Sequence, residues 1–170
     1  MKYSKWLWAV VAAQALFLLG WAGYHEVVLR TAPVLRLKTR PVDPRDLLRG
    51  DYMTLNYDIS HHPAPARERV GQKSTVYVVF KLTDGYGVID EVLFQEPPPG
   101  DPRLCAQAEA LVWSNGETPA EFRLTYGIEQ FFVPEGKGTP RFKTLEAEVS
   151  VSPTHRLYLR RVLVDGKNYP

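Results

Sequence analysis

Cysteine is almost absent from this 170-residue chain, which contains only Cys105. A single thiol cannot form an intrachain disulfide, so a disulfide scaffold is excluded. No signature of a catalytic thiol surrounds Cys105, and we predict a small buried apolar residue there. The net charge is also low, at +2, with basic and acidic residues alternating along the chain. Because no basic face is indicated, we expect no nucleic-acid partner.

Charged side chains are missing from residues 6–24, which read WLWAVVAAQALFLLGWAGY. At a rise of 1.5 Å per residue, a helix of this length approaches the hydrocarbon thickness of a bilayer. Tryptophan or tyrosine stands at both ends of the segment, which is typical of side chains at the membrane interfaces. We therefore predict a transmembrane helix that contacts the lipid bilayer through residues 6–24.

Two lysines, Lys2 and Lys5, precede this segment. The positive-inside rule therefore places the N-terminus in the cytoplasm and the rest of the chain on the other side of the membrane. We expect residues 1–29 to form a cytoplasmic tip and a signal-anchor helix, and residues 30–170 to form an extracytoplasmic domain.

Two alternatives to an anchor exist for this segment. A cleaved signal peptide is conceivable, because Gly20 and Ala22 are small residues two positions apart. However, the apolar segment is longer than the usual core of such a peptide, which favours the anchor. A buried helix of a soluble protein normally keeps a polar face, and this segment has none.

Beyond the apolar segment, alternation of apolar and polar residues predicts β-strands. The predicted runs are 34–38, 53–59, 75–82, 88–94, 104–113, 122–133 with an interruption at Gly127, 145–151, 156–159 and 162–164. The run 104–113 also suits a helix, but the Asn115-Gly116 turn that follows it favours a strand. Asp84-Gly85 predicts a hairpin turn. Roughly seven to nine closely spaced strands predict a mainly β fold, a small antiparallel β-barrel or sandwich.

The most distinctive stretch is residues 41–57, PVDPRDLLRGDYMTLNY. It reads as a turn fixed by proline, followed by a Gly-Asp pair at the start of a strand. Gly50 permits backbone conformations that other residues avoid, and Asp51 can accept hydrogen bonds from local backbone amides. Leu55 and Tyr57 share one face of the predicted strand.

This stretch resembles a bacterial family named after its motif, the GDYXXLXY proteins. All of the named positions are filled, by Gly50, Asp51, Tyr52, Leu55 and Tyr57. The lead-in 41–47 and the separate stretch 126–138, YGIEQFFVPEGKG, are also similar to the family. The resemblance implies a membrane-anchored bacterial protein without an assigned biochemical activity, in a family whose members accompany a multi-pass membrane protein.

We therefore expect an accessory or interaction protein of the bacterial inner membrane, with a periplasmic domain and a multi-pass membrane protein as partner. The candidate motif and partner-surface residues are Pro44, Arg45, Asp46, Arg49, Gly50, Asp51, Tyr52, Leu55, Tyr57, Glu129 and Glu135. The charged residues of the motif's turn form either a local salt-bridge network or a docking surface that fixes a partner's register.

The alternative function is an envelope hydrolase that uses carboxylates or Lys81. Residues 47–53 are similar to the segment after the nucleophile of signal-peptidase-like serine proteases, but residues 41–46 contain no serine or threonine. That mechanism therefore lacks its nucleophile, and only a non-catalytic relative of that barrel stays open. We assign no catalytic residues.

A metal site is not expected either. His61 and His62 point in opposite directions on an extended chain, and no nearby spacing supplies further ligands. We interpret the pair as part of a polar loop and predict no metal and no cofactor.

Overall fold

The computed structural model describes residues 2–40, 52–65, 70–98, 100–114, 119–132 and 143–169. The chain divides into two compact units, residues 1–32 and residues 33–170.

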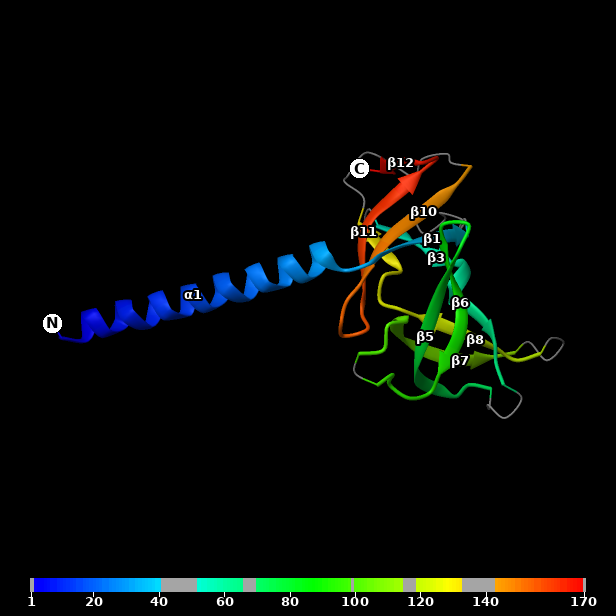
Figure 1. Ribbon diagram of the computed structural model, residues 1–170, viewed down its shortest axis with the longest axis horizontal. Coiled ribbons are helices and arrows are strands. Elements are labelled where there is room, and N and C mark those ends of the chain that lie inside the picture. Colours follow the sequence, from blue (N-terminus) through cyan, green and yellow to red (C-terminus); the bar gives the residue numbers. More distant parts are fainter. Residues whose placement is uncertain are drawn as a thin grey trace. The chain divides into compact units, whose positions relative to one another are not determined.

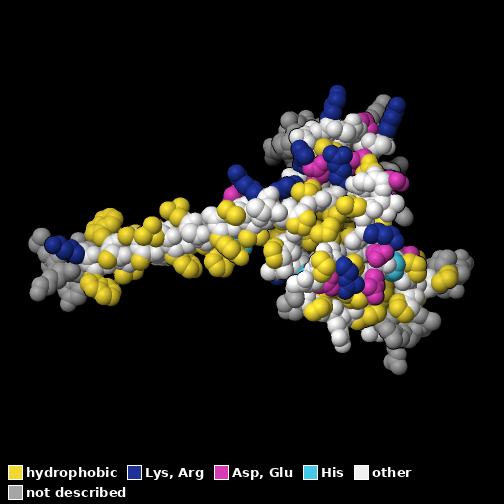
Figure 2. All heavy atoms as spheres, viewed as in Figure 1, with side chains coloured by type: hydrophobic (Ala, Val, Ile, Leu, Met, Phe, Trp, Pro, Cys, Tyr) yellow, Lys and Arg dark blue, Asp and Glu magenta, His cyan; other side chains and the backbone are white. Residues whose placement is uncertain are grey.

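The first unit is a single helix, α1 (Lys2–Thr31). Its segment Lys5–Val28 is long and apolar enough to cross a membrane, and none of that segment is buried inside the protein. Figure 2 shows hydrophobic side chains along the helix, with Lys and Arg side chains only near its ends. The helix stops two residues before Pro33, because a proline disfavours helical backbone in the residue that precedes it.

The second unit is built from antiparallel strands and one short 3-10 helix (Figure 1). The elements before the middle of the chain are β1 (Val34–Arg40), β2 (Tyr52–Thr54), β3 (Asn56–Tyr57), η1 (Asp58–Ser60), β4 (His61–Pro63), β5 (Lys73–Thr83) and β6 (Tyr86–Leu93). Those after it are β7 (Leu104–Trp113), β8 (Glu121–Thr125), β9 (Gln130–Phe132), β10 (Leu145–Val151), β11 (Leu157–Val164) and β12 (Lys167–Tyr169).

These strands form two larger sheets and one small pair. The first sheet has the order β12-β11-β10-β1-β3, the second has the order β4-β8-β7-β5-β6, and β2 pairs with β9. Together the sheets curve into a nearly closed barrel, which confirms the predicted fold class. Strand β6 approaches β1 closely at Gly87, where a Cβ atom would lie 3.3 Å from Leu37 Cδ2. A glycine here lets the two sheets meet.

One hydrophobic core fills the barrel, because each strand sends alternate side chains inward. Leu35 and Leu37 on β1 are fully buried, as are Val76 and Val78 on β5 and Val149 on β10. The apolar face predicted for residues 53–59 is confirmed, since Leu55, Tyr57 and Ile59 all belong to this core. Burial of apolar surface on both sheets holds the barrel together.

Several sequence predictions are confirmed in detail. Residues 104–113 form a strand, β7, and not a helix. Asp84 and Gly85 form the β5–β6 hairpin turn. Their φ angles of 52° and 82° lie in the left-handed region, as this type of turn requires. The predicted interruption at Gly127 separates β8 from β9, and its φ is 82°.

Three predictions were wrong. Ile59 ends the predicted strand 53–59 but lies in η1, because the chain turns there to bring its side chain into the core. His61 and His62 lie in strand β4, paired with Arg123 and Phe122 of β8, and not in a loop. The predicted runs 156–159 and 162–164 form one strand, β11, which begins at Leu157, because an irregularity in its pairing with β10 near Glu148 shifts the alternation.

Candidate functional site

The two stretches that carry the sequence motifs are joined in space. The backbone N–H of Leu55 donates to the carbonyl of Glu129 at 2.7 Å. Strand β2, which holds Tyr52, pairs with β9, which follows Glu129. Residues about seventy positions apart thus form one hydrogen-bonded unit.

Two buried tyrosines reinforce this unit in a reciprocal way. The hydroxyl of Tyr57 donates to the carbonyl of Ile128 at 2.7 Å, and the hydroxyl of Tyr126 donates to the carbonyl of Ile59 at 2.9 Å. Burial raises the pKa of both phenols, and the nearby Glu129 carboxylate adds to the rise. Both hydroxyls are therefore protonated donors at neutral pH, and neither serves as a base.

Glu129 has a local structural role. Its carboxylate accepts hydrogen bonds from the backbone N–H groups of Tyr126 and Gly127, at 2.6 Å and 2.9 Å. A carboxylate that accepts two amides fixes the turn between β8 and β9. The side chain that sequence analysis placed on a partner surface or in a hydrolase thus holds the second motif in shape.

The other predicted site residues fall into two groups. Leu55 and Tyr57 are 1% and 0% exposed, so their side chains are part of the core and do not reach the surface. Tyr52 lies in β2 by its backbone. The remaining candidates lie outside the described residues: Pro44, Arg45, Asp46, Arg49, Gly50, Asp51 and Glu135.

Lys81, the lysine considered as a hydrolytic base, is engaged elsewhere. Its Nζ lies 2.8 Å from the Asp90 carboxylate on the neighbouring strand β6, and both side chains are exposed. The amine is therefore in a solvent-exposed ion pair across a hairpin. The Glu129 carboxylate is held by the backbone N–H groups of Tyr126 and Gly127, so Lys81 and Glu129 have separate structural partners.

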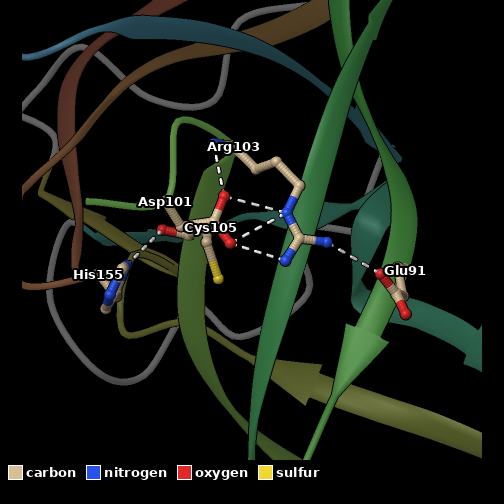
Figure 3. A network of polar contacts seen from close by, with 5 residues as sticks. All are labelled: Glu91, Asp101, Arg103, Cys105 and His155. Atoms are coloured by element: carbon tan, nitrogen blue, oxygen red, sulfur yellow. Dashed lines mark hydrogen bonds and ion pairs between the residues drawn. The ribbon is translucent and has the colours of Figure 1, made fainter. Parts of the chain in front are cut away.

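A polar network covers the outer face of the second sheet near Cys105 (Figure 3). Arg103 lies between two carboxylates, with Nη2 at 2.7 Å from Asp101 and Nη1 at 3.2 Å from Glu91. The hydrogen bond from the Arg103 side chain, with a second from its backbone N–H, lowers the pKa of Asp101 to about 2. The network fixes the loop between β6 and β7 by a bidentate Arg–carboxylate contact.

Cys105 and His155 come together in this network, although they are fifty positions apart. His155 Nδ1 lies 3.4 Å from the backbone oxygen of Cys105, and its ring packs edge-on against Tyr77 at 5.7 Å. Burial raises the pKa of the Cys105 thiol to about 11, and its side chain is 3% exposed. The thiol is therefore neutral and covered, which confirms the predicted buried apolar role and argues against a nucleophile.

A groove of about 320 Å³ opens beside the motif, between the end of β1, the segment 58–62 and the β5–β6 hairpin. Its lining combines apolar side chains with polar ones: Lys38, Asp58, Ile59, His61, His62, Thr83, Asp84, Tyr86, Gly87, Val88 and Ile89. This volume and mixture are typical of a small binding groove. The groove could not be recognised from the sequence, because its lining comes from three segments that are far apart along the chain.

The charged groups of the groove have definite positions. Lys38 Nζ lies over the Tyr86 ring, 4.4 Å from its centroid, while the Tyr86 hydroxyl donates to Glu146 at 2.8 Å. His61 Nδ1 is 3.3 Å from Glu121, and burial lowers the pKa of His62. Within the described part of the chain, no group of three or more His, Cys, Asp or Glu side chains is arranged to hold a metal ion.

The comparison with protein families assigns the chain to a family. The family model described as "GDYXXLXY protein" matches residues 14–164. The chain belongs to the GDYXXLXY family. Neither the search of curated proteins nor the search of solved structures found a match.

The GDYXXLXY match covers both motif stretches and every strand from β1 to β11, together with more than half of α1. Of the residues that name the family, Leu55 and Tyr57 pack into the core, and Tyr52 lies in strand β2. In this GDYXXLXY protein the named positions Leu55 and Tyr57 specify structure, because they bind the second motif and not an exposed surface.

Proposed function

We propose that this GDYXXLXY protein is anchored in the bacterial inner membrane by α1 and holds its β domain in the periplasm to bind a multi-pass membrane protein. The observation that carries the proposal is the segment Lys5–Val28, which is apolar and wholly exposed. Large apolar side chains left in water would be costly along the whole helix, whereas a bilayer buries them.

The charges at the ends of α1 support a cytoplasmic N-terminus. Lys2 and Lys5 precede the apolar segment. After it, Arg30 is paired with Glu26 at 2.6 Å, so the first positive charge on that side is compensated. Positive charge in short flanks is retained in the cytoplasm.

Labelling with a membrane-impermeant maleimide tests this orientation. Glu96 is exposed, so a Glu96→Cys variant in a Cys105→Ala background presents one accessible thiol. We expect labelling in intact spheroplasts. Labelling only after the inner membrane is broken would place the domain in the cytoplasm and contradict the proposal.

A binding role, as opposed to catalysis, is supported by the contacts of the candidate catalytic groups. Lys81 is in an ion pair, Glu129 caps a turn, and the Cys105 thiol is buried. The lining of the groove beside the motif combines apolar with polar and charged side chains, as protein-binding surfaces do. We propose that a loop of the membrane partner docks in this groove.

Co-purification in mild detergent tests the partner, and one added side chain tests the surface. Thr83→Arg places a bulky cation in the groove, and Asn168→Arg adds the same side chain on exposed β12 as a control. We expect a stable membrane partner with the wild type and with Asn168→Arg, and loss of that partner with Thr83→Arg.

Two results would contradict these proposals separately. Recovery of no stable membrane partner with the wild-type protein would contradict the proposed accessory function. Recovery of the same partner by Thr83→Arg, at wild-type yield, would show that docking takes place elsewhere, with the charged residues Arg49 and Asp51 of the motif as the next candidates.

A further inference from the structure

The turn between β10 and β11 lies beside the residue at which the chain enters the β domain. The backbone N–H of Val151 donates to the carbonyl of Pro33 at 3.0 Å, and Val34 pairs with Ser150. Because β10 runs antiparallel to β1, it ends where β1 begins. The turn 152–156 then continues past that point.

Covalent reach limits how far this turn can be from a membrane. Pro33 follows Val28, the last residue of the apolar segment, by five positions. Five residues span at most about 18 Å even when fully extended. The headgroup layer itself occupies several ångströms of that reach. The turn is thus tethered near the headgroups by chain length alone.

The charge of this hairpin is of one sign. Residues 152–161 read SPTHRLYLRR and contain three arginines, one histidine and no acidic residue. The β5–β6 and β11–β12 turns, by contrast, each carry an aspartate, Asp84 and Asp165. Of the nearby carboxylates, Asp101 binds Arg103, and Glu148 is shared by Arg36 and by Arg161 of the hairpin itself. One carboxylate therefore faces two arginines, and Arg156 is exposed at the end of the turn.

Two exposed side chains, one apolar and one aromatic, flank the turn. Val34 and Tyr158 lie on either side of Ser150 across β1, β10 and β11. Val34 is 41% exposed and Tyr158 is 37% exposed, whereas Ser150 between them is fully buried. A tyrosine with a half-exposed ring beside arginines is suited to the membrane interface, where one side is apolar and the other is hydrated.

The turn is also held rigidly. The N–H of Ser152 donates to the carbonyl of Arg156 at 2.9 Å, and the Ser152 hydroxyl oxygen accepts from the N–H of Arg156 at 3.1 Å. His155 has a φ of 57°, and its carbonyl accepts from the N–H of Gln107 at 2.7 Å. The turn is therefore pre-organised, so that contact with a surface costs little ordering entropy.

We propose that the β10–β11 turn, with the exposed side chains of Val34 and Tyr158, forms a membrane-contact surface that binds anionic lipid headgroups, with Arg156 as the principal contact. This inference rests on the proposed anchoring by α1. The contact would limit the tilt of the β domain relative to the bilayer and so keep the groove at a defined height.

Spin labelling of the full chain in lipid nanodiscs tests the proposal. In a Cys105→Ala background, Thr154→Cys places the label on the turn, and Asn168→Cys places it on β12 as a control. The discs contain either phosphatidylcholine alone or phosphatidylcholine mixed with anionic phosphatidylglycerol. The measurement is the accessibility of each label to an aqueous nickel chelate.

We expect the accessibility at position 154 to fall by at least about two-fold in anionic discs relative to neutral discs, while position 168 changes little. Adding Arg156→Glu should abolish the difference. Equal accessibility of position 154 in both lipids, or a difference that survives Arg156→Glu, would overturn the proposal. Failure of the protein to float with the discs would overturn the anchoring itself, and with it this inference.

Discussion

The hydroxyl of Tyr57 donates a 2.7 Å hydrogen bond to the backbone carbonyl of Ile128, across seventy-one positions of the chain. Tyr57 is the last named residue of the GDYXXLXY motif, and Ile128 lies in the second stretch that resembles the family. The bond is buried, so each group depends on the other for its hydrogen bond. Both motif stretches are therefore needed to form this one structural unit.

Replacing Tyr57 by phenylalanine should destabilise the β domain by about 1–3 kcal/mol, because the Ile128 carbonyl would be left buried without its donor. Thermal unfolding followed by circular dichroism in detergent measures the change. Tyr158→Phe is the matched control, and its effect should stay within about 0.5 kcal/mol because that ring is partly exposed. Equal effects of the two substitutions would contradict the structural role of Tyr57.

Replacing Glu129 by alanine should also destabilise the domain, by about 1–3 kcal/mol, because the N–H groups of Tyr126 and Gly127 lose a charged acceptor. Glu129→Gln keeps one acceptor oxygen and should lose less. Urea unfolding of the three proteins gives the comparison. Wild-type stability of the alanine variant would show that the carboxylate does not cap the turn.

The Asp101–Arg103 contact predicts an acid-dependent part of the stability. The pKa of Asp101 is lowered from 3.8 to about 2, so the folded state binds this proton less readily than the unfolded state. The stabilisation is therefore complete above about pH 4 and is lost as the pH falls towards 2.

Arg103→Gln tests this dependence, with carboxyl titration by NMR and unfolding measured from pH 6 to pH 2. The Asp101 pKa should rise towards its ordinary value, and the difference in stability from wild type should shrink as the pH falls below 4. Arg103→Lys, which keeps the charge without the planar fork, should be intermediate. An unchanged Asp101 pKa in Arg103→Gln would refute the assignment.

The Cys105 thiol should react very slowly with an aromatic disulfide reagent at pH 8 in the folded protein, because it is buried and its pKa is raised to about 11. Unfolding should release it to react at once. A Thr154→Cys variant supplies an exposed thiol as a positive control. Rapid reaction of the folded wild type would contradict the burial.

Local patterns predicted what depends on neighbouring residues. The alternation in residues 104–113 identified β7 despite its alanines, and Asp84-Gly85 identified the hairpin between β5 and β6. The same reasoning failed at His61-His62, because a short strand with polar residues has little periodicity and is defined by its pairing with β8. It failed in β11 because the shifted pairing with β10 breaks the alternation.

For the candidate site too, the sequence identified residues, and only the structure assigned their roles. Sequence reasoning found Tyr57 and Glu129 because they lie in distinctive stretches, but it could not assign their roles. The same residue type can serve in binding or in packing. Only the burial and the hydrogen-bond partners of the side chain distinguish the two roles.

The sequence by itself determined the apolar helix, the β class of the domain, the burial of Cys105 and the family, because each depends on composition, on period along the chain or on a contiguous motif. Only the tertiary structure decided that Tyr57 and Tyr126 bridge the two motifs, that Glu129 caps a turn, and that the β10–β11 turn lies beside Pro33. These are contacts between residues distant in sequence, and strand order and register bring them together without leaving a local pattern.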